Sequence, residues 1–129
     1  MIGEPEMIQK LQRAAEQGDA EAQLSLGIAY RFRQGVLQDC KEGLNWYRKS
    51  AEQGGVIAQH RLGYAYEVGE GVPKNTATVY AWYNVATANG SFLAPGARDR
   101  VAKEMTAEQI AEGQKLSTEW FEKYQPKDK

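Results

Sequence analysis

The chain has 129 residues, of which 42% are hydrophobic and 26% are charged, which suits one domain with a single apolar core. Its 16 basic and 17 acidic residues nearly cancel and the basic residues are scattered, which argues against general binding to nucleic acid or to an anionic membrane. No apolar run approaches the roughly 20 residues that are needed to span a bilayer, so we expect no membrane insertion.

The cysteine content and the first residues bear on the compartment. Cys40 is the only cysteine, so no intrachain disulfide can form, and a reducing compartment is compatible with the sequence. Residues 1–6 lack the positive and apolar regions of a secretion signal. We therefore expect a cytoplasmic protein, with a periplasmic or secreted location as the alternative if a signal peptide has been removed.

The first predicted helix covers about residues 6–17 and ends at Gly18. Its apolar residues recur at helical spacing and face one side: Met7, Ile8, Leu11, Ala14 and Ala15. Lys10 stands where two later helices carry tryptophan, as suits a terminal helix that meets water. Residues 5–18 are therefore predicted to be an N-terminal capping helix, or else the cut end of a longer array.

A 36-residue repeat then follows. When residues 22–54 are aligned with 58–90, eleven positions are identical, and their first copies are Ala22, Gln23, Leu26, Gly27, Ala29, Tyr30, Gly35, Val36, Trp46, Tyr47 and Gly54. A fixed period of this size with helical patterning predicts stacked helix pairs, each of which buries its apolar face against its neighbours. We assign residues 19–54 to repeat 1 and residues 55–90 to repeat 2.

The first helix of each repeat carries a glycine inside its packing stripe, Gly27 in repeat 1 and Gly63 in repeat 2. A glycine inside a helix costs about 1 kcal/mol relative to alanine. Its recurrence therefore indicates that another helix approaches closely at this position.

The second helices are predicted at about 40–53 and 76–89, after glycine-containing loops. Asp39 and Asn75 stand at the N-cap positions, and Glu42 completes a capping-box pattern with Asp39. Each helix ends at a glycine, the residue type that closes helices in a left-handed conformation.

The repeat decays after Gly90, because Arg98 and Asp99 stand where Leu62 and Gly63 would recur. A short helix is predicted at about 95–104, and Thr106 opens a final helix at about 107–124 with a second capping box. The inner face of that helix is predicted to hold Ile110, Ser117, Trp120, Phe121 and Tyr124. Residues 91–125 thus form C-terminal capping helices, and the whole chain is predicted to be all-α, an α-solenoid of antiparallel helix pairs.

The string Ala-Gln-x-x-Leu-Gly-x-x-Tyr, followed by Gly-Val, Trp-Tyr and Ala-Glu-Gln-Gly, resembles the Sel1-like repeat family, relatives of tetratricopeptide repeats, over residues 14–90. The segment from Arg98 to Trp120 resembles a C-terminal segment of bacterial members. The resemblance implies a concave face that binds proteins or peptides, often as an adaptor. Arg33 departs from the usual glycine, so the first loop is expected to be tighter or partly helical; no cysteine pair of the kind found in some exported members is present.

By similarity to tetratricopeptide repeats, residues just off the packing stripe of the first helices are expected to line the inner groove. These candidate partner-binding residues are Leu24, Ile28, Arg31, Phe32, His60, Tyr64, Glu67, Val68 and Arg100, with Glu21, Ile57, Leu93 and Lys103 beside them. Such a mixture suits an amphipathic helix or an extended segment with apolar anchors. The alternative is that Leu24, Ile28 and Val68 are peripheral core.

Other chemistry-bearing residues have simpler interpretations. The lone His60 and a passive Cys40 do not make a catalytic pair, and the repeated Trp-Tyr pairs are expected in the core rather than on a sugar- or base-stacking surface. The sequence shows no metal-ligand cluster, phosphate loop or nucleophile motif. We therefore predict no catalytic residue, no metal and no cofactor.

These observations favour a non-enzymatic protein-interaction module or adaptor that binds a protein or peptide partner. Two alternatives stay open. One is an enzyme or binder that acts on cell-wall or peptide substrates, although no nucleophile, base and orienting residue are evident together. The other is a self-associating scaffold, a homodimer formed through Met7, Ile8 and Leu11 of the N-terminal helix.

Overall fold

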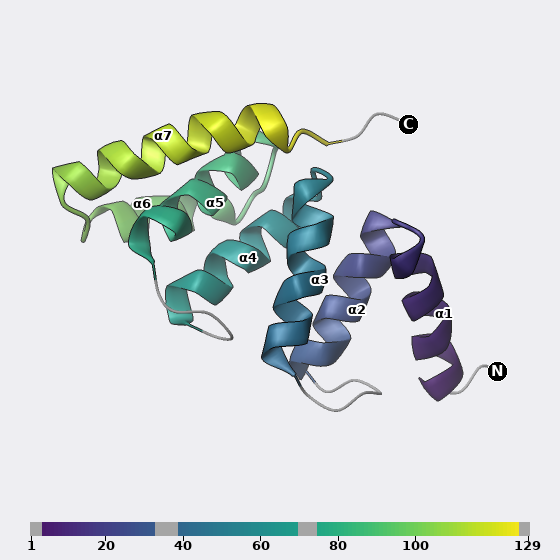
Figure 1. Ribbon diagram of the computed structural model, residues 1–129. Coiled ribbons are helices and arrows are strands. Elements are labelled where there is room, and N and C mark those ends of the chain that lie inside the picture. The colour runs from purple at the N-terminus through teal and green to yellow at the C-terminus, as the bar shows by residue number, and fades with distance from the viewer. Residues whose placement is uncertain (1–3, 33–38, 70–74, 127–129) are drawn as a thin grey trace.

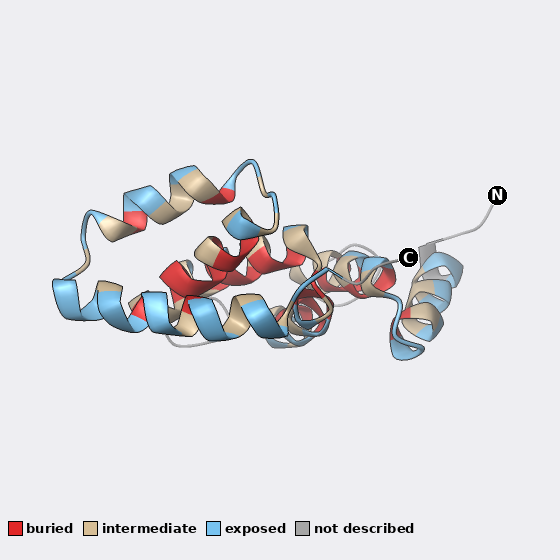
Figure 2. Ribbon diagram, turned by 90° about the horizontal axis from the view of Figure 1, so that it is seen from above, coloured by how far each residue is buried: buried red, intermediate tan, exposed pale blue. Residues whose placement is uncertain are grey.

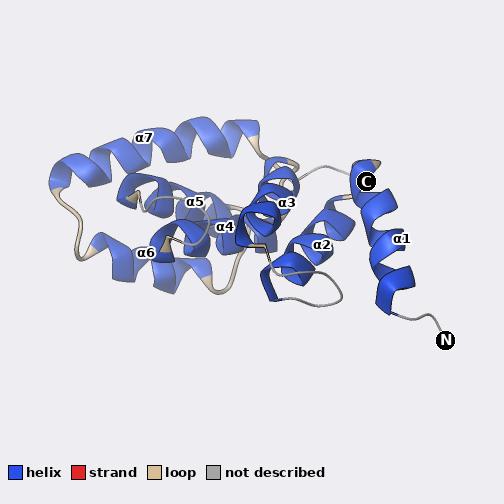
Figure 3. Cartoon of the chain, turned by 60° about the horizontal axis from the view of Figure 1, so that its bottom comes forward, coloured by secondary structure: helices blue, strands red, loops and turns tan. Residues whose placement is uncertain are grey.

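The computed structural model describes residues 4–32, 39–69 and 75–126. Within these residues the chain consists of helices joined by turns and loops and contains no strand, which confirms the all-α prediction (Figure 3). The helices follow one another along a stacked array with α1 at one end and α7 at the other (Figure 1). Their bounds are α1 Glu4–Glu16, α2 Ala20–Phe32, α3 Cys40–Glu52, α4 Val56–Val68, α5 Thr76–Ala88, α6 Ala94–Ala102 and α7 Ala107–Lys123.

The helix ends form as the cap residues predict. Glu42 N donates to Asp39 Oδ1 at 3.1 Å, Thr78 N donates to Asn75 Oδ1 at 3.1 Å, and Thr106 forms a complete capping box with Gln109. The reciprocal bond expected from the Glu42 side chain is absent at α3, because the Asp39 backbone N–H donates to Tyr30 O at 2.9 Å instead. The expectation for the Arg33 loop lies outside the described residues.

The repeated glycines hold the two helices of each repeat in close contact. A methyl group at Gly27 would lie 2.6 Å from Tyr47 Cδ1, and one at Gly63 would lie 2.7 Å from Tyr83 Cδ1. Both tyrosines are almost fully buried, with exposed fractions of 2% and 0%. The predicted close approach is therefore confirmed, and the ring of the second helix fills the space that a side chain on the first helix would take.

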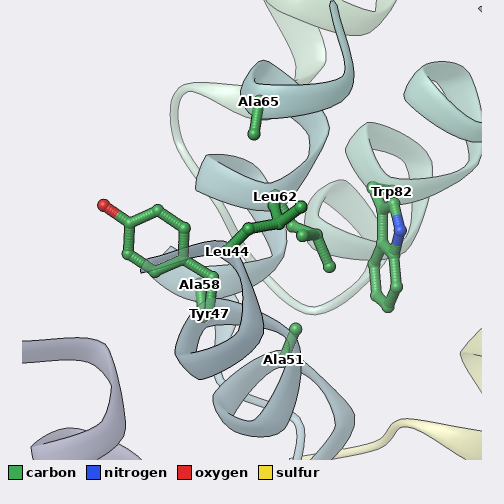
Figure 4. Close-up of a cluster of buried hydrophobic side chains, with 7 residues drawn as sticks. All are labelled: Leu44, Tyr47, Ala51, Ala58, Leu62, Ala65 and Trp82. Carbon is green, nitrogen blue, oxygen red and sulfur yellow. The ribbon is translucent and has the colours of Figure 1, made fainter. Parts of the chain in front are cut away.

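The core runs along the array between the helix pairs. Its central cluster joins α3, α4 and α5 and consists of Leu44, Tyr47, Ala51, Ala58, Leu62, Ala65 and Trp82 (Figure 4). Trp46 belongs to a neighbouring cluster, where it packs with Ala15, Ala22 and Leu26. The repeated tryptophans and tyrosines are thus core residues, as their phase in the repeat predicts.

Two buried glutamines link successive repeats by the same hydrogen bonds. Gln23 Nε2 donates to Ala15 O at 3.1 Å and Gln23 Oε1 accepts from Gln53, while Gln59 Nε2 donates to Ala51 O at 3.1 Å and Gln59 Oε1 accepts from Asn89. Each glutamine therefore ties the end of the preceding helix to the end of the following one. Buried polar groups that are satisfied in this way fix one stacking arrangement.

The last helix leaves the repeat pattern. The helix α7 packs against α5 rather than pairing with α6, and Figure 2, seen from above, shows buried residues of the core between α6 and α7. The rings of Trp120 and Tyr124 lie 4.6 and 5.7 Å from the ring of Trp82. Beside them, Gln125 and Pro126 pass against Gly54, which has a φ of 92°. The helix α7 thus covers one side of the last repeat.

Replacement of Gly63 by alanine should lower stability. The added methyl group would overlap the buried Tyr83 ring, and overpacking of this kind costs about 1–3 kcal/mol, more than the gain in helix propensity. Urea unfolding of Gly63→Ala should therefore show a loss of about 2 kcal/mol. The matched control is Gly96→Ala in α6, where nothing lies within 4 Å of the new methyl group and stability should stay the same or rise slightly. Equal unfolding midpoints for the two variants would contradict the close contact.

Candidate partner-binding groove

A surface pocket of about 200 Å³ lies where the first helices of the two repeats meet the turn before α6. We call it the groove and define it by its lining residues, Arg31, Phe32, Tyr47, Ile57, His60, Arg61, Tyr64 and Leu93. The α4 residues among them follow helical spacing from Ile57 to Tyr64, so they share one face of the helix. The opposite face of α4 carries Ala58, Leu62 and Ala65 into the core.

The groove exposes apolar side chains to solvent. Phe32 is 48% exposed, Ile57 59%, Tyr64 44% and Leu93 70%. Phe32 lies on α2, Ile57 and Tyr64 lie on α4, and Leu93 directly precedes α6. The four side chains therefore come from three segments that are separate in the sequence. A cluster of exposed apolar side chains around a pocket is a common mark of an interaction surface.

The groove also carries positive charge. Arg31 and Arg61 line it, and no Asp or Glu does so among the residues that the structure describes. The Arg31 guanidinium lies over the Phe32 ring, 4.6 Å from its centroid. The Nε of Arg61 is buried and has no hydrogen-bond partner among the described residues.

His60 forms part of the groove wall. Its ring centroid lies 5.6 Å from that of Tyr83. Burial lowers the pKa of His60 below its usual value, and the neighbouring Arg61 lowers it further, against a smaller opposite effect of Glu67. The imidazole is therefore neutral around pH 7 and adds a polar but uncharged surface.

Three other predicted site residues line a second cavity of about 370 Å³ instead of the groove. They are Glu67, Val68 and Arg100. Tyr83 Oη donates to Glu67 Oε1 at 2.6 Å, and the Arg100 guanidinium donates to both carboxylate oxygens. Burial, and then the bond to Glu67, raises the pKa of Tyr83; the bond to Glu67 raises that of Arg100. The Glu67 and Arg100 charges therefore compensate each other.

The structure thus divides the predicted site. It brings Arg31, Phe32, His60 and Tyr64 together in the groove, and Ile57 and Leu93 join them. Leu24 and Ile28 are half-buried and pack against the central cluster, which fits the peripheral-core alternative for these two residues. Glu21 lies at a different pocket, between α1 and α2, and Lys103 is exposed outside the groove.

Sequence reasoning missed Arg61 and Tyr47 as groove residues. Tyr47 was assigned to the core, where most of its ring lies, but it also reaches the groove floor. Arg61 lies four residues after Ile57 and three before Tyr64, so its helix phase was a usable signal.

The described residues contain no group of three or more His, Cys, Asp or Glu side chains that could hold a metal ion. They also contain no helix with the length and apolar character to cross a membrane.

The fold is therefore that of a helical-repeat protein with a groove along its first helices. The Sel1 repeat family matches residues 11–19, 20–55 and 56–91, which is more than half of the chain. The chain belongs to the Sel1 repeat family. Membership suggests a helical-repeat module for protein interaction, and the Sel1 fold is typically a non-catalytic scaffold.

Two solved structures show the same arrangement. One is a protective antigen of uropathogenic Escherichia coli strains that displays an SLR fold, with a TM-score of 0.90 and 34% identity over 93% of this chain and 26% of that one. The other is a Sel1 repeat protein from Oxalobacter formigenes, with a TM-score of 0.76 and 34% identity over 78% of this chain and 29% of that one. The chain thus spans less than a third of the length of these two proteins. The comparison with curated proteins gives no match.

The lowered pKa of His60 predicts a pH effect on stability. Below its ordinary value of 6.5, the unfolded chain binds a proton at His60 more readily than the folded chain does, so the free energy of unfolding should fall as the pH drops through this range. The variant His60→Gln lacks this contribution. Urea unfolding at about pH 7.5 and about pH 5 should therefore show a smaller loss for His60→Gln than for the wild-type chain. Parallel pH profiles would show that His60 is not held in its neutral form.

Proposed function

We propose that the chain is a non-enzymatic interaction module that binds a peptide segment of a protein partner in the groove. The observation that carries this proposal is that four apolar side chains, 44–70% exposed, gather around one pocket formed by α2, α4 and the turn before α6. The helices beneath them are fixed by the Gly–Tyr contacts and by the buried glutamines, so the groove needs little reorganisation when it binds. A rigid surface with a few apolar anchors is a favourable arrangement for capturing a segment.

Binding should depend on the apolar wall of the groove. Peptides selected from a random phage-displayed library on the wild-type chain provide probes, and their affinity is measured by fluorescence polarisation. Ile57→Asp places a charge among the apolar anchors and should weaken binding at least about tenfold. Asp is favourable in the first turn of a helix, so α4 should remain folded.

The matched control is Phe92→Asp. Phe92 is fully exposed in the turn before α6 and does not line the groove, so this variant should bind the selected peptides as the wild-type chain does. Equal binding by the Ile57 variant and the wild-type chain would place the peptide elsewhere.

Self-association is a second candidate, because one face of α1 is open. A pocket between α1 and α2 is lined on the α1 side by Met7, Lys10, Leu11 and Ala14. The equivalent face of α3, 36 residues later, is covered by α2, because Gly43 and Tyr47 contact Gly27 there. Met7 is 51% exposed in this pocket. A second copy packed there would cover the face.

Light scattering over a range of concentrations tests this candidate. The wild-type mass should rise toward that of a dimer with concentration, whereas Met7→Asp should stay monomeric because a charge would be buried in the contact. A wild-type chain that is monomeric throughout contradicts self-association and leaves peptide binding in the groove as the function.

A further inference from the structure

We propose that the groove selects segments in which an acidic residue stands close to apolar residues, and that Arg61 binds the carboxylate. This inference rests on the proposed function, since it names the chemistry of the segment that the groove takes. It follows from the charge of the groove, the state of Arg61 and the spacing of the neighbouring side chains.

Among the described residues that line the groove, two are arginines and none is acidic. The acidic residue on the same face of α4 is Glu67, but its carboxylate already accepts from Tyr83 and from Arg100. A segment that carries a negative charge therefore complements the groove, and one that carries a positive charge is repelled.

Arg61 is the groove arginine for which the described residues supply no counter-ion. Its Nε is buried without an acceptor, and the described residues give its guanidinium no hydrogen bond or ion pair. Part of the cost of removing this group from water is therefore not offset within the chain. A carboxylate can form charge-assisted, bidentate bonds with a guanidinium, which makes it a suitable ligand.

The neighbours of Arg61 define the surroundings of that carboxylate. Ile57 lies four residues before Arg61 and Tyr64 three residues after it, so both lie about one helical turn away on the same face. One turn rises about 5.4 Å, and residues two apart in an extended segment are separated by about 6.6 Å. The groove thus fits an extended segment with an acidic residue in the middle and an apolar residue two positions to either side.

Oriented peptide libraries test the inference on the full chain. Each library has one fixed central residue, Asp or Glu, Asn or Gln, Lys or Arg, or phosphoserine, between randomised positions. The wild-type chain should enrich the Asp and Glu libraries and should favour apolar residues two positions away. Arg61→Gln should weaken binding of the best acidic peptide about tenfold, with little effect on its Asn or Gln form, as the loss of one charged hydrogen-bonded pair implies.

Charge reversal provides the sharpest readout. Arg61→Glu should shift enrichment from the Asp and Glu libraries to the Lys and Arg libraries, while Arg61→Lys should keep the acidic preference. Circular dichroism checks that each variant is folded. The control is Lys115→Glu, a reversal of the same kind on the exposed face of α7, which should leave the preference unchanged.

The outcomes separate this inference from the proposed function. If apolar peptides are enriched without an acidic preference, or if the Arg61 variants bind acidic peptides as the wild-type chain does, the role of Arg61 is wrong and groove binding stands. Stronger enrichment of phosphoserine than of Asp and Glu would make phosphate the ligand in place of a carboxylate. If no library is enriched at all, the proposed function itself fails.

Discussion

The close contact between a glycine on the first helix and a tyrosine ring on the second organises each repeat. Gly27 against Tyr47 and Gly63 against Tyr83 bring the helix backbones together and fix the rotation of each first helix about its axis. Once Gly63 faces Tyr83, the residues on the other side of α4 must face solvent. The outward position of Ile57 and Tyr64 is therefore a consequence of how the core packs.

A second constraint keeps the repeats in register. The side chain of each buried glutamine reaches a carbonyl at the end of the preceding helix, and its own carbonyl accepts from the helix that follows. A shift of one repeat against the next would leave these groups without partners in the core, which costs about 1–3 kcal/mol for each group. The register of the array in turn sets the distance between α2 and α4, and so the width of the groove.

The features that the sequence predicts well are local or periodic. Asn75 caps a helix through its own backbone neighbours, and the recurrence of Gly63 marks a contact that any copy of the repeat must make. The path of α7 could not be predicted in this way, because Arg98 and Asp99 indicate only that the repeat pattern ends. The position of α7 depends on the contact of Gly113 with the Tyr80 ring and of Trp120 with Trp82. These contacts join segments that share no sequence repeat. The division of the candidate site has the same origin, since Leu24 and Ile28 are half-buried by contacts with a cluster that other helices supply.

The place where the repeat ends also shapes the groove. Ile28, Tyr64 and Arg100 are 36 residues apart and hold equivalent positions on successive first helices. At this position of α6 the apolar residue is thus replaced by Arg100, which binds Glu67 of α4. This pair closes the apolar surface on that side and uses the one carboxylate on the outer face of α4 near the groove. Among the described residues Arg61 therefore has no counter-ion beside an apolar wall, and a negative charge on a bound segment would complement it.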